Sequence, residues 1–140
     1  NLFPLICDVA SNKIDKLIIH GNDWPTSDGT CVRDYIHIAD LADIHKLAIE
    51  YLSKGGSSQT LNCGYGKGFS VFQVINKVKE ISNNNFKVLT KPRREGDPDI
   101  LVANSDLCKK ILNWVPKNNS IDQIIKDSLE WEKNKLKYLI

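Results

Sequence analysis

The residues best suited to bind a ligand lie in the segment PRREGDP at positions 92–98. Arg93 and Arg94 carry planar guanidinium groups, which can donate paired hydrogen bonds to a diphosphate from a loop held by prolines. Asp97 follows them, and its carboxylate can accept hydrogen bonds from ribose hydroxyls. The combination matches the phosphate and ribose of a nucleotide. A solvated surface turn whose charges neutralise one another is the alternative interpretation.

A second segment with chemical potential covers residues 25–45, PTSDGTCVRDYIHIADLADIH. A polar turn leads to Arg33, which carries a permanent charge and several donors. The side chains from Tyr35 to Ile38 predict a short strand, and Asp40 is suited to cap a helix after it. This order of turn, arginine, strand and helix is typical of a segment that faces a ligand. An ordinary turn, strand and helix without a ligand would give the same pattern.

Three glycines, Gly64, Gly66 and Gly68, form a turn between a predicted strand and a predicted helix. Such turns can present backbone N–H groups to the pyrophosphate of a dinucleotide. The dinucleotide-binding fingerprint, however, needs a glycine one position later, where Phe69 stands, and no acidic residue follows at the distance that would hold a ribose. We therefore favour a tight structural turn with Ser70 as the helix N-cap.

The histidines and carboxylates that follow Arg33 do not indicate acid–base catalysis. His37 falls on the predicted strand and His45 inside the predicted helix, so structural roles are favoured for both. Asp40 and Asp43 form a carboxylate pair only in sequence, and the cap explains Asp40 better.

The hydrophobic periodicity predicts alternating helices and strands along the chain. Helices are expected at 2–11, 40–52, 70–82, 105–112 and 120–137, and strands at 17–20, 35–38, 60–63 and 86–89. The helix after Asp40 is expected to bury an apolar face that includes Ile44, Tyr51 and Leu52. These elements indicate a mixed α/β fold whose sheet is too small for a complete doubly wound domain.

The composition indicates a single globular domain. The chain has 140 residues, 41% of them hydrophobic, and a net charge of +2 without a run of one sign, so a nucleic-acid or membrane surface is not indicated. Four cysteines without metal-ligand spacing are expected to be reduced thiols: Cys7, Cys31, Cys63 and Cys108. No run approaches the ~18 apolar residues of a membrane span, and the chain opens with Asn1 and no basic leader. We expect a soluble, intracellular chain that is truncated at its amino terminus.

Five motifs, in their order along the chain, resemble UDP-glucose 4-epimerase, an extended short-chain dehydrogenase/reductase. They are NLFPLI, PTSDGTCVRDYIH, NCGYGKGFS, KPRREGDPDILVA and LNWVP. The resemblance covers nearly the whole chain and follows the carboxy-terminal part of the family. It implies a small, mixed α/β substrate-binding portion that lacks most of the Rossmann domain. Residues 1–140 would form this UDP-sugar-binding portion, and about 34–53 would pack on the missing Rossmann half.

The resemblance also implies which residues bind the UDP-sugar. Arg94 and Asp97 would grip the UDP moiety, and Arg33 would meet the diphosphate from the opposite side. The uracil and sugar pocket would be lined by Tyr35, Asn1, Leu2 and the edge formed by Ile18, Ile19 and His20. At this last position the family commonly has an apolar residue in place of histidine. Leu101 would limit the room beside the C2 substituent of the sugar.

The function implied for the complete protein is the NAD-dependent interconversion of UDP-glucose and UDP-galactose in galactose metabolism. NAD would be bound by the missing amino-terminal half, and the complete protein would be a cytoplasmic homodimer with no nucleic-acid or membrane partner. The family's Tyr-x-x-x-Lys pair is not found at Tyr35, Tyr51 or Tyr65, so we assign no catalytic residue and expect the chain alone to be inactive. The alternatives are another nucleotide-sugar epimerase, dehydratase or decarboxylase, and a non-catalytic nucleotide-binding module.

Overall fold

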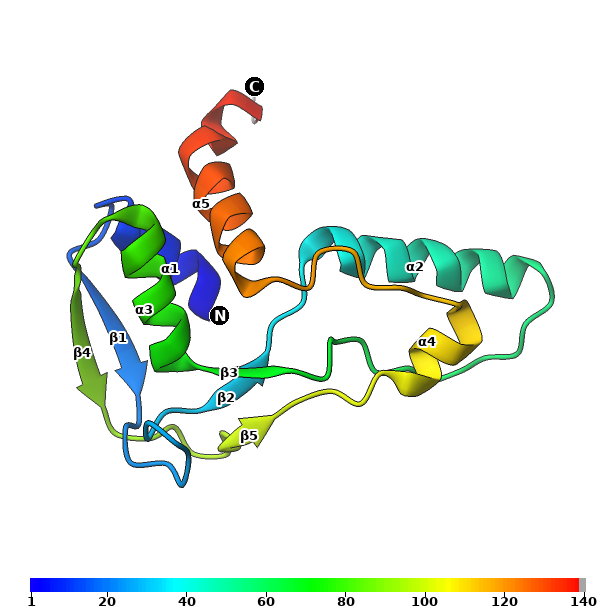
Figure 1. Ribbon diagram of the computed structural model, residues 1–140, viewed down its shortest axis with the longest axis horizontal. Coiled ribbons are helices and arrows are strands. Elements are labelled where there is room, and N and C mark those ends of the chain that lie inside the picture. The colour runs from blue at the N-terminus through cyan, green and yellow to red at the C-terminus, as the bar shows by residue number, and fades with distance from the viewer. Residues whose placement is uncertain (139–140) are drawn as a thin grey trace.

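The computed structural model describes residues 1–138, in which helices and strands alternate (Figure 1). In chain order the elements are α1 (Leu2–Ala10), β1 (Lys16–His20), β2 (Val32–Asp34), α2 (Ile38–Ser53), β3 (Gly68–Ser70), α3 (Val71–Ser82), β4 (Lys87–Lys91), β5 (Ile100–Leu101), α4 (Asp106–Leu112) and α5 (Ile121–Tyr138). A larger lobe contains α1, α3, α5, β1 and β4, and an arm contains α2 and α4 (Figure 1). None of the described helices is both long and apolar enough to cross a membrane.

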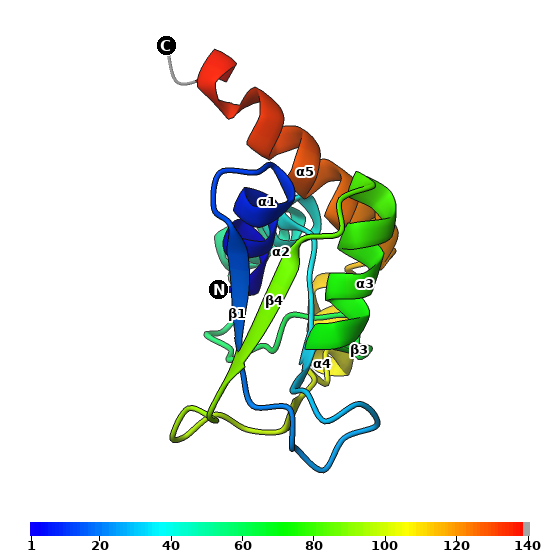
Figure 2. The same ribbon diagram turned by 90° about the vertical axis from the view of Figure 1, so that its left-hand side faces the viewer.

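The core of the lobe lies between the paired strands β1 and β4 and the three helices. Figure 2 shows the two strands running side by side along this lobe. Ile6, Leu17, Ile75 and Ile125 are fully buried there, and they come from α1, β1, α3 and α5 in turn. Each of these helices presents an apolar face, and the fold buries the three faces together.

The strands form two small sheets. β1 pairs in parallel with β4, and the register puts His20 opposite Lys91. β2 is the central strand of the second sheet, antiparallel to β3 and parallel to β5. Its register puts Arg33 between Phe69 of β3 and Leu101 of β5. The loop that joins β4 to β5 therefore leaves one sheet and enters the other, so both sheets fix its ends.

The predicted strand at 35–38 is wrong, because β2 ends before it and α2 begins at its last residue. The helix cap is also different: it is His37, not Asp40, and the His37 Nδ1 accepts a hydrogen bond of 3.1 Å from the Ala39 N–H. The other ring nitrogen, Nε2, donates to Asp127 of α5 at 2.9 Å. Strand-forming side chains favour a strand only where a neighbouring strand can pair, and here helices surround them.

Asp40 is fully buried and joins α2 to the segment before α5. Its carboxylate accepts hydrogen bonds from the Tyr65 hydroxyl at 2.8 Å, from Asn118 Nδ2 at 2.8 Å, and from the N–H groups of Lys117 and Asn118 at 3.1 and 3.0 Å. Burial by itself raises the pKa of Asp40, but these hydrogen bonds outweigh it and hold the pKa below its ordinary value. Asp40 lies near the start of α2, but it is a buried anchor and not the helix cap.

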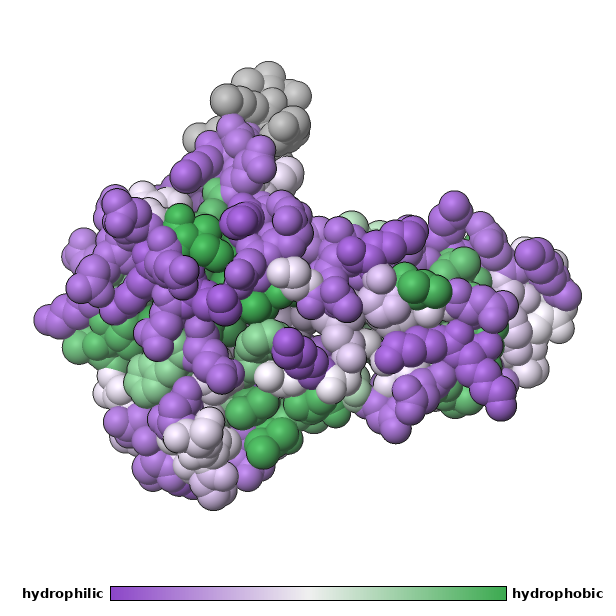
Figure 3. Space-filling model, in the orientation of Figure 1, coloured by the Kyte–Doolittle hydropathy of each residue, from purple (hydrophilic) through white to green (hydrophobic). Residues whose placement is uncertain are grey.

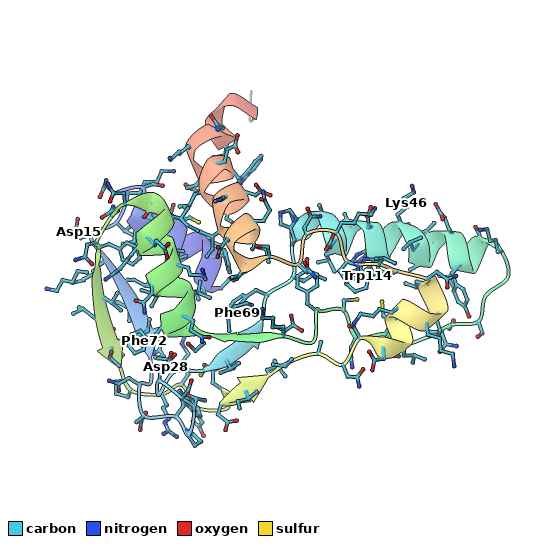
Figure 4. The ribbon with its side chains drawn as sticks, viewed as in Figure 1. Asp15, Asp28, Lys46, Phe69, Phe72 and Trp114 are labelled. Carbon is cyan, nitrogen blue, oxygen red and sulfur yellow. The ribbon has the colours of Figure 1, made fainter. Side chains whose placement is uncertain are left out.

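The arm has its own small core between α2 and α4, which consists of Ile44, Cys108, Leu112 and Trp114. Figure 4 shows Trp114 between the two helices, whereas Lys46 points away from α4. The predicted strand at 60–63 is wrong. Its residues Leu61 and Cys63 pack against this core without pairing with a strand. The four cysteines are free, and Cys7, Cys31 and Cys108 are buried.

Helix α2 is apolar on two sides. Ile44 is buried and Tyr51 packs beside it in the core of the arm. Away from this core the helix exposes Ile38, Ile49 and Leu52, at 74%, 68% and 52% of their surface. The expectation that Leu52 is buried with Ile44 is therefore wrong. Figure 3 shows hydrophobic side chains at the surface of the lobe and of the arm.

The remaining predicted elements are confirmed to within two residues at each end. Ser70 caps α3 through a capping box, in which its hydroxyl accepts from the Gln73 N–H and the Gln73 side chain accepts from the Ser70 N–H. The sequence did not indicate β2, β3 or β5, because strands of two or three residues carry too few side chains for a periodic pattern.

Candidate functional site

An open pocket of about 300 Å³ lies between α1, β1, β2 and the loop that joins β4 to β5. We call it the arginine pocket. Nine of the ten residues predicted to bind a UDP-sugar line it: Asn1, Leu2, Ile18, Ile19, His20, Arg33, Tyr35, Arg94 and Asp97. These residues come from four segments that lie far apart in the sequence, so the fold brings them together.

Strand β2 supplies one wall of the arginine pocket, because side chains alternate along an extended chain. Cys31, Arg33 and Tyr35 line the pocket, whereas Asp34 lies on the other side of the strand. Tyr35 also packs edge-on against Phe3 of α1, with ring centroids 5.3 Å apart. Burial raises the pKa of Tyr35 to about 12, so its hydroxyl stays protonated at neutral pH and can donate a hydrogen bond.

Backbone carbonyls hold the guanidinium of Arg33 at the wall of the pocket. Nη1 donates to the Val32 carbonyl at 2.9 Å, and Nη2 donates to the Pro98 carbonyl at 2.8 Å. A longer contact of 3.4 Å joins Nη1 to the Asp99 carbonyl. These bonds tie β2 to the end of the loop and fix the direction of the remaining N–H groups. A guanidinium that is already fixed loses less freedom when it binds an anion.

The two neighbouring arginines of the loop have different surroundings. Arg94 is exposed and lines the arginine pocket. Arg93 lies instead over the ring of Trp24, with its guanidinium carbon 4.2 Å from the ring centroid, and its Nε donates to Asp23 at 2.8 Å. The Asp97 N–H donates to the Arg94 carbonyl at 3.4 Å and closes a turn between these two pocket residues. The two arginines were predicted to act together, but only Arg94 lines the pocket.

Positive charge converges on the arginine pocket. Arg33 and Arg94 contribute guanidinium groups from different segments. Helix α1 begins at the pocket with Asn1 and Leu2, and the Asn1 side chain makes no capping hydrogen bond. A helix N-terminus carries partial positive charge and unpaired N–H groups. The pocket therefore suits an anion such as a diphosphate, and the Asp97 carboxylate adds an acceptor for a hydroxyl group.

Two of the predicted residues lie at the margin of the pocket. Leu101 is not part of its lining: it stands beside Arg33 on the adjacent strand β5 and is 60% exposed. Its role beside the sugar therefore stays a prediction. His20 lines the pocket at the end of β1, and its Nδ1 donates to the Pro92 carbonyl at 3.3 Å. This histidine thus reaches both the pocket and the start of the loop.

The glycine-rich turn does not provide a cradle for a dinucleotide. The N–H groups of Tyr65 and Gly66 donate to the Asp34 carboxylate at 3.1 and 2.9 Å, so they are not free to bind a pyrophosphate. A Cβ on Gly64 would lie 2.5 Å from the same carboxylate, which explains the glycine there. The turn is thus structural, as predicted. Among residues 1–138 no group of three or more histidine, cysteine or acidic side chains is placed to hold a metal ion.

Sequence reasoning missed several residues that complete the walls of the pocket. They are Leu5, Leu17, Gly21, Cys31 and Val71. Two of them had a local signal: Cys31 lies two positions before Arg33 on an extended chain, and Leu5 lies one helical turn after Asn1. Leu17 and Gly21 flank the predicted edge 18–20 in the sequence, and Val71 reaches the pocket only through tertiary packing.

Residues 2–64 match the model of the NAD dependent epimerase/dehydratase family. The chain is 42% identical over 134 residues to the UDP-glucose 4-epimerase of Azospirillum brasilense. The aligned residues are 96% of this chain and 38% of that protein. The chain resembles part of a UDP-glucose 4-epimerase. It spans about 40% of the length of the curated 4-epimerases that it matches.

Solved 4-epimerases share this fold. The UDP-Glc/GlcNAc 4-epimerase of Campylobacter jejuni matches with a TM-score of 0.84 and 41% identity, over 95% of this chain and 40% of that one. The UDP-glucose 4-epimerase of Stenotrophomonas maltophila, solved with NAD and formylated UDP-arabinopyranose, matches with a TM-score of 0.90 and 33% identity, over 99% of this chain and 41% of that one. The predicted mixed α/β class is confirmed, and the fold matches a part of these solved 4-epimerases.

Proposed function

We propose that the chain forms the UDP-sugar-binding part of a UDP-glucose 4-epimerase, which interconverts UDP-glucose and UDP-galactose in galactose metabolism. The observation that carries this proposal is the convergence of Arg33, Arg94 and Asp97 on one pocket. The identity to the Azospirillum brasilense enzyme and the UDP-sugar in the Stenotrophomonas maltophila structure support it. The complete protein is a cytoplasmic homodimer in this proposal.

The diphosphate binds between the two guanidinium groups. Arg33 holds it from the strand and Arg94 from the loop, while the N-terminus of α1 adds N–H groups at Leu2. Asp97 accepts hydrogen bonds from the ribose, and the edge of β1 lines the uracil and sugar pocket. The neutral Tyr35 hydroxyl donates a hydrogen bond to the ligand. Because the diphosphate carries most of the contacts, the sugar keeps the freedom to turn.

We assign NAD to an amino-terminal Rossmann half of the complete protein. The glycine-rich turn does not offer free donors to the pyrophosphate of the cofactor, since the N–H groups of Tyr65 and Gly66 are bonded to Asp34. No catalytic step is therefore assigned to residues of this chain. Its part in the reaction is to bind and orient the UDP-sugar, and the chain alone does not turn the substrate over.

Residues 34–53 pack on that Rossmann half in this proposal. The exposed apolar side of α2, with Ile38 and Ile49, is the surface that such packing would cover. A groove of about 580 Å³ adjoins it between α1, α5 and the start of α2, and its lining includes Ile36 and Trp131. Burial of the apolar side chains of α2 and of this groove would supply the hydrophobic driving force for the packing.

Calorimetric titration of the 140-residue chain with UDP, uridine and ADP tests the proposal. We expect UDP to bind at least about tenfold more tightly than uridine, because both guanidinium groups contact only the diphosphate. ADP carries the same diphosphate and is the matched control for the base, so it should bind more weakly than UDP. Equal affinity for UDP and uridine, or no binding of either, would contradict the proposed function.

A further inference from the structure

Arg93 makes contacts that its neighbour Arg94 does not make, although both belong to the loop that joins β4 to β5. Its guanidinium carbon lies 4.2 Å from the centroid of the Trp24 ring. Its Nε donates to Oδ1 of Asp23 at 2.8 Å, and its Nη2 donates to the Asp23 carbonyl. A stacked ring and two hydrogen bonds thus fix one side chain of the loop to the turn that follows β1.

The turn after β1 is shaped to receive this side chain. Gly21 has a φ of 79°, and a Cβ on it would lie 2.4 Å from Nε1 of Trp24 and 2.9 Å from Cγ of Arg93. A larger residue at this position would displace the ring or the arginine. Nε1 of Trp24 is buried and has no hydrogen-bond partner among the described residues, so packing holds the indole ring in place.

The far end of the loop is fixed by a different contact. Nη2 of Arg33 donates to the Pro98 carbonyl at 2.8 Å, so the loop is held on both sides of the stretch that contains Arg94 and Asp97. Only a guanidinium can stack on a ring and donate from Nε and Nη2 at the same time. Removal of Arg93 would leave the longer contact of 3.3 Å from His20 Nδ1 to the Pro92 carbonyl as the side-chain hydrogen bond at the start of the loop.

We propose that Arg93 is a positioning residue for diphosphate binding: Trp24 and Asp23 clamp it, and the clamp holds the loop so that Arg94 and Asp97 face the arginine pocket. This role rests on the proposed UDP site, and Arg93 itself does not touch the ligand. The ion pair with Asp23 is partly exposed, with 39% of the arginine side chain and 69% of the aspartate side chain accessible. Such pairs contribute little to folding stability, so the loss of Arg93 should lower the affinity for UDP and leave the stability of the fold almost unchanged.

The first test measures the dissociation constant of UDP for variants of the chain. Arg93→Ala and Arg93→Lys should each weaken UDP binding about tenfold, because the ordering of the loop must then occur on binding. Lys91→Ala is the matched control, since it removes an equal exposed charge two positions away and should change affinity less than about twofold. Melting temperatures should stay close to that of the wild type. A loss with Lys91→Ala as large as with Arg93→Ala would show that only charge matters and would overturn the clamp.

Substitutions at Trp24 test whether UDP affinity depends on an aromatic ring under Arg93. Trp24→Phe keeps a smaller aromatic ring under Arg93 and loses an N–H that has no partner among the described residues, so UDP affinity should stay closer to that of the wild type than in Trp24→Ala. Trp24→Ala should weaken binding as much as Arg93→Ala. The double variant should be no weaker than either single one, because both changes break the same contact. Fully additive losses would contradict a shared clamp.

A second measurement reports the clamp without UDP. Glu95 is exposed within the loop, and a glutamate-specific protease can cut after it. Arg93→Ala and Trp24→Ala should be cut there about fivefold faster or more, and Lys91→Ala at the wild-type rate. If Arg93→Ala were cut after Glu95 at the wild-type rate, the clamp would be overturned, even if the wild-type chain binds UDP. A wild-type chain that fails to bind UDP would instead overturn the proposed function, whatever the cleavage rates.

Discussion

The Tyr65 hydroxyl donates a hydrogen bond of 2.8 Å to the buried carboxylate of Asp40. The Tyr65 ring also stacks on Trp114, with centroids 6.3 Å apart. Burial raises the pKa of Tyr65 to about 12, so the donor keeps its proton at neutral pH. Because Asp40 also binds the segment at Asn118, three chain segments meet at this carboxylate and join the arm to the lobe.

Asp40→Asn should therefore destabilise the fold. The amide keeps one acceptor oxygen and turns an NH₂ group toward N–H donors, which should lower the free energy of unfolding by about 2–4 kcal/mol. Asp43→Asn on the same helix is the matched control, since the exposed pair of Asp43 with Lys117 Nζ at 2.6 Å should contribute under about 1 kcal/mol. Urea unfolding of both variants measures the difference. Equal effects would mean that the buried network is not a main anchor.

Glu132 should make stability depend on pH. Hydrogen bonds from Lys13 and Lys135 lower the pKa of this buried carboxylate to about 2 in the folded chain. Because the folded pKa lies below the ordinary value of 4.5, the stabilisation is complete above about pH 4.5 and is lost as the pH falls toward 2. Glu132→Gln should remove this part of the pH dependence of the unfolding free energy. Glu130→Gln, on the exposed side of the same helix, should keep it; a Glu132→Gln variant that also kept it would refute the assignment.

The sequence predicts those features that depend on a few neighbouring residues. Ser70 was recognised as a cap because the capping box lies within four residues, and the pocket residues were found because the motifs of the family mark them one by one. His37 and Asp40 show the limit. Both lie where a cap can form, and only donors near Asn118, far away in the sequence, reveal that Asp40 is an anchor.

Arg93 and Arg94 show the same limit at the candidate site. They are neighbours of identical type, so no local property distinguishes them. Their roles differ because one side chain meets Trp24 and Asp23 across the fold while the other lines the pocket. The short strands β2 and β5 were missed for a related reason, since pairing rather than composition defines them.

The exposed side of α2 should cause self-association of the chain. Ile49→Ser and Leu52→Ser together remove apolar surface that a partner would cover, so they should shift the chain toward monomer in analytical ultracentrifugation. Val115→Ser is the matched control, because Val115 is equally exposed outside this helix and its loss should change little. A wild-type chain that stays monomeric at high concentration would contradict the expectation.

Leu101 should set the preference for the sugar in the complete protein. An acetamido group beside this apolar side chain would displace it or leave an amide unsatisfied, so we expect a preference of about ten- to hundredfold in kcat/KM for UDP-glucose and UDP-galactose over their N-acetyl forms. Leu101→Gly should narrow the gap. Ile100→Gly, on the other face of the same strand, should leave it unchanged. Equal wild-type values for both sugar pairs would show that Leu101 does not limit the site.

The most direct test of the central claim is the affinity for UDP of the Arg33→Ala and Arg94→Ala variants, with uridine as the control ligand. Each substitution should weaken UDP binding by about 2–5 kcal/mol where the ligand desolvates the guanidinium, and by under about 1 kcal/mol where it stays exposed. Uridine affinity should hardly change, because the base and ribose keep their contacts. If both variants bound UDP as tightly as the wild type, the loop would be a solvated surface turn and the arginine pocket would not be a diphosphate site.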